Sequence, residues 1–199
     1  MIFLMIKKCF FNILFFNQHD KNKIFERCTL IIFMIFPLMA IAQETPQLIN
    51  YPNTIYKAHN QNWAIAQSKD NIIYVANSDG LLEYDGAVWK LYPLPNRQII
   101  RTVLCDTMAN GDSRVYVGGF SEFGYWQKSG KGQLIYHSLS QGTTFKSLKT
   151  EEIWHITKTT DAIYFQSFAR IYKYDGRKIT ELKSSGNFMF IRNVKNRLF

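Results

Sequence analysis

The amino-acid sequence predicts an all-β fold, a partial β-propeller of about three four-stranded blades plus the start of a fourth, after a helical signal segment. Three observations carry this prediction. A unit of four short strand-like segments recurs after residue 62, and the equivalent residues Tyr74, Tyr116 and Tyr164 lie 42 and 48 residues apart. Self-similarity at this period, with four strands in each unit, is typical of propeller blades. Helical periodicity is missing from the repeated region.

Each unit has the residue types that strands and tight turns prefer. The second segment of every unit is β-branched and aromatic, as in Ile73-Tyr74-Val75. Two units share the sequence Tyr-Asp-Gly at 84–86 and 174–176, and Asp-Gly favours a hairpin turn because glycine tolerates a positive φ. The predicted blades are, in order, 63–92, 101–139, 153–182 and a partial fourth at 187–199.

The number of blades leads to an expectation about the whole protein. Propellers close with about four to eight blades, and closure removes exposed sheet edges. Three blades and part of a fourth leave both edges open. We therefore expect the chain to be a fragment, with the remaining blades and downstream domains of the full-length protein as its partners.

Residues 1–42 have the features of an export leader. Basic residues precede an apolar run at 28–42, which is shorter than the roughly 20 residues that span a bilayer. The run ends in an A-x-A pattern where polarity rises sharply, so we predict a signal peptide cleaved after Ala42. The alternative is a retained N-terminal anchor. Residues 1–20 suggest a start site placed too far upstream, and 43–62 form a lead-in segment. The residues that define the predicted cleavage site are Ala40, Ala42 and Gln43.

Composition and motifs argue against several kinds of chemistry. The net charge is +9, but basic residues alternate with acidic ones, so we predict no nucleic acid contact by this segment. Cys105 is the one cysteine beyond the leader, and no Cys/His grouping suggests a metal. Glu151 and Glu152 would point to opposite faces of a strand and are expected to be solvated. We therefore predict no catalytic constellation, no metal site and no cofactor.

The loops at one face of the predicted propeller form the candidate binding surface. In this fold the loops between second and third strands share a face with the loops between blades. These loops mix acids, amides, arginine and aromatic side chains, which suits a polar ligand such as a glycan or a peptide. The tryptophans are expected to pack within or between blades, with sugar stacking as the alternative. The candidate ligand-binding residues are Asn77, Ser78, Asp79, Asn96, Arg97, Phe120, Ser121, Glu122, Phe168 and Arg170.

The segments NIIYVANSDGLLEYDG, RVYVGGFSEFGYW and IYKYDG occur in this order, and together they resemble the two-component-regulator propeller repeats of Bacteroidetes-type bacteria. More narrowly, the chain resembles the N-terminal sensor of exported regulators with a triple-tyrosine module and a LuxR-type helix-turn-helix domain. Related proteins carry a histidine kinase after the same kind of propeller. The resemblance covers about residues 50–199.

This resemblance implies a periplasmic, ligand-sensing propeller of a transmembrane signalling or transcriptional regulator. In the full-length parent it would be tethered to the inner membrane and would form a homodimer, with the output domains lying outside this sequence. Two alternatives remain from the residues themselves. One is a secreted propeller enzyme of lyase or dehydrogenase type, and the other is an adhesion or scaffold propeller without signalling output.

Overall fold

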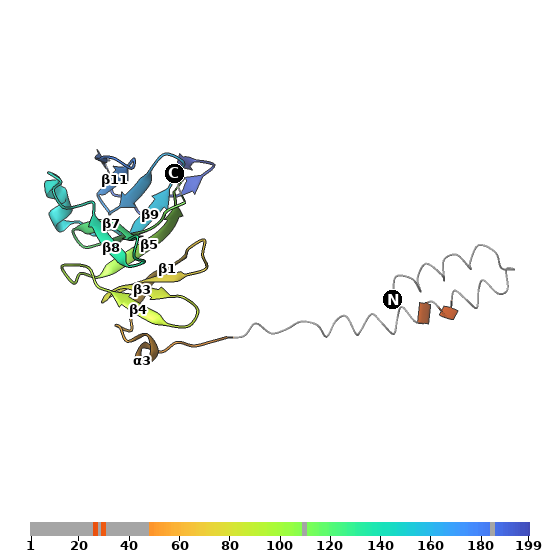
Figure 1. Cartoon of the computed structure of the whole chain (residues 1–199). Coiled ribbons are helices and arrows are strands. Elements are labelled where there is room, and N and C mark those ends of the chain that lie inside the picture. Colours follow the sequence, from red (N-terminus) through yellow and green to blue (C-terminus); the bar gives the residue numbers. More distant parts are fainter. Residues whose placement is uncertain (1–25, 28, 31–47, 109–110, 184–185) are drawn as a thin grey trace. The chain divides into compact units, whose positions relative to one another are not determined.

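The strands of the chain form successive antiparallel sheets in chain order (Figure 1). The computed structural model describes residues 26, 27, 29, 30, 48–108, 111–183 and 186–199. The chain divides into two units, Met1–Ile49 and Asn50–Phe199. In the first, residues 26, 27, 29 and 30 are helical, and the predicted cleavage site at Ala40, Ala42 and Gln43 lies outside the described residues. Across the described residues, no helix has the length and apolar character needed to cross a membrane.

In the described part of the second unit, three sheets have four strands each, and neighbouring strands along the chain pair within each sheet. This meander is the blade architecture of a propeller, so the predicted fold class is confirmed. The strands are β1 (Asn62–Gln67), β2 (Ile73–Asn77), β3 (Gly80–Tyr84) and β4 (Trp89–Tyr92) in the first blade; β5 (Ile100–Thr107), β6 (Ser113–Gly119), β7 (Glu122–Lys128) and β8 (Leu134–Ser138) in the second; and β9 (His155–Lys158), β10 (Ile163–Gln166), β11 (Arg170–Tyr174) and β12 (Ile179–Lys183) in the third.

After the third blade the chain forms a short hairpin. Strand β13 (Asn193–Val194) pairs with β14 (Arg197–Leu198). Residues 187–192, the beginning of the predicted partial fourth blade at 187–199, are not in a strand. Two of these residues still contribute to packing, because the buried Ile191 and the half-buried Phe188 contact Tyr164 and Ile171 of the third blade.

The second strand of each blade is buried on both faces. In β6, Val115 and Val117 point back into the cluster shared with the first blade, whereas Tyr116 points forward into the cluster shared with the third. The same alternation holds in β10, where Ile163 points back and Tyr164 forward. Successive side chains of a strand face opposite ways, so one strand can supply both interfaces. The recurring tyrosines are therefore the forward-facing contacts between blades.

The lead-in segment covers the rear face of the first blade. Helix α3 (Asn53–Tyr56) places the buried Tyr56 against Val75 and Leu82. Tyr51 lies beside it, and its ring centre is 5.5 Å from that of Trp89. These aromatic side chains occupy the face that a preceding blade would otherwise bury.

The longer spacing between the second and third tyrosines is explained by the loop after β8. This loop contains the 3-10 helix η1 (Lys146–Thr150). Its buried Leu148 and the neighbouring Phe145 pack into the cluster between the second and third blades. The additional residues thus widen the hydrophobic core rather than interrupt the repeat.

The consecutive glycines at the end of β6 allow close packing between blades. A Cβ atom added to Gly119 would lie 2.1 Å from the carbonyl oxygen of Ile99, and one added to Gly118 would lie 2.5 Å from a methyl group of Ile153. These distances are well below van der Waals contact. Gly119 therefore lets the loop before β5 approach β6, and Gly118 lets the segment before β9 pack against the second blade.

Replacing Gly119 with alanine should destabilise the protein, because the obstructing atom belongs to the backbone of the loop before β5. We expect Gly119→Ala to lower the free energy of unfolding by about 1–3 kcal/mol, the usual range for overpacking. Chemical denaturation followed by circular dichroism measures the difference. The control is Gly130→Ala, where an added Cβ meets no atom within 4 Å. Equal stability of the two variants would contradict the steric argument.

Candidate functional site

Bulges in β1 and β5, together with the residue just before β9, bring together three side chains from three blades. The ladder register shifts around Trp63 in β1 and around Arg101 in β5. Trp154 immediately precedes β9, and its backbone N–H donates a hydrogen bond to the carbonyl of Gln166. Bulges re-aim side chains away from the ordinary pleat. Because β1 packs against β5 and β5 against β9, the three side chains meet at one end of the inner strands.

Arg101 lies between the two tryptophans. Its guanidinium carbon is 3.8 Å from the ring centre of Trp63 and 5.1 Å from that of Trp154. The two indole rings are 6.4 Å apart, in an edge-to-face arrangement. Each arginine–aromatic contact of this kind stabilises by about 0.5–2 kcal/mol, depending on how far the cation is desolvated. We call Trp63, Arg101, Glu152 and Trp154 the arginine cluster.

Glu152 completes the cluster from the segment before β9. Phe120 and Glu152 form an isolated β-bridge, and the Ile153 N–H donates to the carbonyl of Gly119, so this segment runs along the end of the second blade. The carboxylate Oε1 of Glu152 then accepts a hydrogen bond from Nε of Arg101 at 2.5 Å. This geometry shows that the prediction of a solvated Glu152 is wrong.

The ion pair is largely shielded from water. The Arg101 side chain is 15% exposed and that of Glu152 is 20% exposed. Nη1 of Arg101 is buried, and it has no hydrogen-bond partner within the part of the chain that the structure describes. Such a donor is costly to leave unsatisfied, by about 1–3 kcal/mol. The cluster thus retains hydrogen-bonding capacity that a nearby acceptor could use.

Exposed aromatic rings surround the cluster. Trp63 is 37% exposed, Phe120 is 47% and Phe168 is 49%. The ring centre of Phe168 is 5.7 Å from that of Trp154. Aromatic faces beside a cation and a carboxylate can bind a ligand that has both apolar surfaces and polar groups, such as a sugar ring or a peptide.

Two of the residues predicted for the binding face have structural partners. Asn77 is buried, and its Nδ2 donates to the carbonyl of His59 at 2.6 Å and to Oδ1 of Asn62 at 2.7 Å. Glu122 is also buried, and it accepts hydrogen bonds from the hydroxyls of Tyr136 and Ser138. Burial, together with the Glu122 carboxylate, raises the pKa of Tyr136 well above its usual range, so this phenol remains a donor.

The other predicted residues are divided between the cluster and the surrounding loops. Ser78 accepts a hydrogen bond from the indole N–H of Trp63 at 3.1 Å, which connects it to the cluster. Asp79 is exposed and accepts a hydrogen bond from the backbone N–H of His59 at 2.7 Å. Arg170 forms an ion pair with Glu181 at 2.7 Å. The remaining predicted residues are exposed or half-buried in the loops: Asn96, Arg97, Phe120, Ser121 and Phe168.

The repeat alignment itself indicates the arginine cluster. When the repeats are aligned, Trp63, Arg101 and Trp154 occupy the same position, at the start of the first strand of each unit. The tryptophans are in fact of two kinds. Trp126 is buried between the first and second blades, and Trp89 packs beneath the lead-in segment, whereas the other two belong to the cluster.

The fold and the cluster define a class of protein, the β-propeller built from four-stranded antiparallel blades. No family model matches the chain, and no curated protein matches it. Similar solved structures include the extracellular domain assigned to the hybrid two-component system BT4673 of B. thetaiotaomicron. It has 17% identity and a TM-score of 0.51 over 69% of this chain and 18% of that one.

The extracellular domain assigned to BT3049 of the same organism has 13% identity and a TM-score of 0.51, over 75% of this chain and 20% of that one. The chain therefore spans about a fifth of the length of either domain. At these identities the likeness shows a shared fold.

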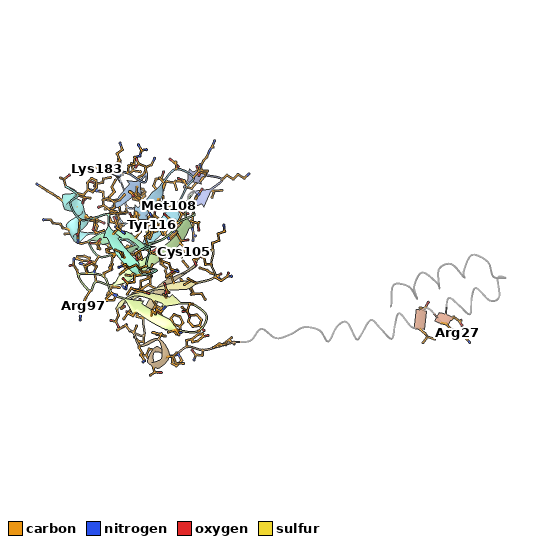
Figure 2. All side chains as sticks on the ribbon, in the orientation of Figure 1. Arg27, Arg97, Cys105, Met108, Tyr116 and Lys183 are labelled. Carbon is orange, nitrogen blue, oxygen red and sulfur yellow. The ribbon has the colours of Figure 1, made fainter. Side chains whose placement is uncertain are left out.

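Removing the arginine should weaken the junction of the three blades. We expect Arg101→Ala to lower the free energy of unfolding by about 1–3 kcal/mol, because it removes a charge-assisted hydrogen bond and leaves Glu152 unpaired. Thermal and chemical denaturation test this. Arg97→Ala is the matched control, because Arg97 is an exposed arginine in the loop between the first and second blades (Figure 2). A control variant as unstable as Arg101→Ala would argue against a specific role for the cluster.

Proposed function

We propose that this chain is the extracytoplasmic, ligand-sensing propeller portion of a bacterial transmembrane signalling or transcriptional regulator. The observation that carries the proposal is the arginine cluster, in which side chains from three blades meet beside exposed aromatic rings. The shared fold with extracellular domains assigned to hybrid two-component systems supports a sensing role over a catalytic one.

The proposed ligand is a polar molecule with flat apolar faces, either a glycan or a peptide. Trp63 and Phe168 expose enough ring surface to stack against it. Asp79, also exposed, would accept hydrogen bonds from hydroxyl or amide groups. Stacking on aromatic rings combined with a few polar contacts is the usual composition of such sites.

The position of the cluster suggests how binding is passed on. A ligand that contacts Trp63 and Trp154 at once would tie the first blade to the third across the second. It would then favour the arrangement of blades that it binds best, and so shift the population of the receptor toward that arrangement. In the full-length parent this shift would act on homodimer packing and on the output domains.

Further blades would pack against the hairpin end of the third blade. Met189, Phe190, Val194 and Phe199 are exposed there although all are apolar. Burying apolar surface of this kind is the main force that joins blades. The proposed partners on this side are therefore the remaining blades of the parent protein.

Export can be tested directly on the processed protein. We expect expression in a Gram-negative host to give periplasmic material whose N-terminal residue is Gln43, because cleavage after Ala42 follows from the A-x-A pattern. Mass spectrometry of the fractionated protein identifies that residue. Ala40→Asp should block processing, since the position requires a small residue. Uncleaved protein that remains in the cytoplasm would contradict the proposal.

Ligand binding can be tested with panels of oligosaccharides and short peptides. We expect some members of one panel to raise the melting temperature, and Trp63→Ala to weaken their binding tenfold or more, about 1.4 kcal/mol. Phe168→Ala should have a smaller effect of the same sign. Phe190→Ala is the matched control, an exposed phenylalanine outside the site. If a ligand binds Trp63→Ala and Phe168→Ala as tightly as it binds the unaltered protein, the binding site lies elsewhere.

A further inference from the structure

A cavity of about 220 Å³ lies between the second and third blades, on the face opposite the arginine cluster. Its walls come from the turns that join β5 to β6, β9 to β10 and β11 to β12. The arginine cluster lies at the other end of these strands, where the second strand of each blade turns into the third. Met108 and Tyr116, both labelled in Figure 2, are among the lining residues. The cavity is therefore distinct from the site discussed above.

Arg114 supplies a positive charge to this cavity, and its cross-strand neighbour Asp106 pairs with Lys158 instead. Its guanidinium carbon is 4.2 Å from the ring centre of Tyr125, and its Nε donates to Oε1 of Gln127 at 3.0 Å. It forms no ion pair with any carboxylate in the described part of the chain. Burial by itself would lower the pKa of Arg114, but the hydroxyl of Tyr116 and the neighbouring tyrosines outweigh burial and raise it. Arg114 therefore remains cationic.

Asp175 supplies a negative charge at the edge of the same cavity, with the cations Lys178 and Lys173 nearby but not in an ion pair with it. Its Oδ1 accepts hydrogen bonds from the backbone N–H groups of Arg177 and Lys178, each at 2.9 Å. These two bonds hold the pKa of Asp175 below its usual value, so the carboxylate is ionised. Among the described residues, Oδ2 has no hydrogen-bond partner and the carboxylate has no ion pair.

The other charged residues that line the cavity are engaged with partners. Lys158 forms an ion pair with Asp106. Asp161 accepts a hydrogen bond from the hydroxyl of Thr159 at 2.5 Å and pairs with Lys173 at 3.3 Å. Within the part of the chain that the structure describes, Arg114 and Asp175 are thus the two charged lining residues that form no ion pair, and they have opposite signs.

Comparison with the preceding junction shows that the repeat does not require these charges. Arg114 of the second blade is equivalent to Ile72 of the first. Arg114 precedes Val115, which pairs with Trp126, and Ile72 precedes Ile73, which pairs with Tyr84 in the same way. By the same registers, Gln127 of the second blade occupies the position of Asp175. The junction of the first and second blades therefore has an isoleucine and an amide where this cavity has a cation and an anion.

We propose that this cavity binds a small zwitterion, a free α-amino acid, with its carboxylate on Arg114 and its ammonium group on Asp175. The guanidinium can hold a carboxylate through two parallel hydrogen bonds. The buried side chains of Ala162 and Ile163 and the Tyr174 ring line the same space and give the amino-acid side chain an apolar surface. This inference does not depend on the function proposed for the opposite face.

The test is calorimetric titration of the full chain with each of the common L-amino acids as probe. We expect at least one of them to bind, and its N-acetyl and carboxamide derivatives to bind at least tenfold more weakly. Asp175→Asn should weaken binding about tenfold, since it removes the charge but keeps the oxygen that accepts the turn hydrogen bonds. Arg114→Met should do the same on the carboxylate side.

The matched control is Asp85→Asn. Asp85 makes the equivalent turn in the first blade, where it accepts hydrogen bonds from the N–H groups of Ala87 and Val88, and it does not line the cavity. This variant should bind normally. Failure of every amino acid to bind the folded chain would overturn the proposal. So would N-acetyl derivatives that bind as well as their parents, or unchanged affinity in Asp175→Asn. The derivatives test the idea even if Arg114→Met does not fold.

Discussion

The burial of the second strand of each blade on both faces is the constraint on which the rest of the structure depends. Such a strand must have a sheet or another apolar layer on either side, because half of its side chains face each way. Val117 and Tyr116 show this within one strand, packing against the preceding and the following blade respectively. Blades are therefore stable as neighbours, and their order along the chain becomes their order in space.

The same stacking determines where chemistry can gather. Once adjacent sheets pack through their second strands, their inner strands lie side by side and equivalent positions of the repeat become neighbours. Arg101 reaches Glu152 across 51 residues of sequence for this reason. At the opposite face, the turn that holds Asp175 lies against the strand that carries Arg114. In the arginine cluster and in the cavity alike, the backbone repeats from blade to blade while the side chains at equivalent positions differ.

The strands could be predicted because their pattern is local. Alternating β-branched and aromatic residues around Tyr74, bounded by turn residues, indicate a buried strand without knowledge of its neighbours. The polar loop residues were harder to interpret. Asn77 and Glu122 are residue types that are common in binding loops. Their side chains instead form hydrogen bonds with other groups of the fold, the carbonyl of His59 and the hydroxyl of Tyr136. Sequence composition does not distinguish these roles, because both need hydrogen-bonding side chains at turns.

The lead-in segment makes the two ends of the stack of sheets different. Tyr51 and Tyr56 seal the rear of the first sheet with aromatic rings, much as a capping repeat ends a solenoid. At the other end of the stack, Phe190 and its apolar neighbours are open to solvent. The two ends of the stack therefore differ: apolar side chains are exposed at the hairpin end, whereas a sheet packed against the capped end would compete with two tyrosines for the same surface. A ring that closed on itself would have to resolve that competition at its seam.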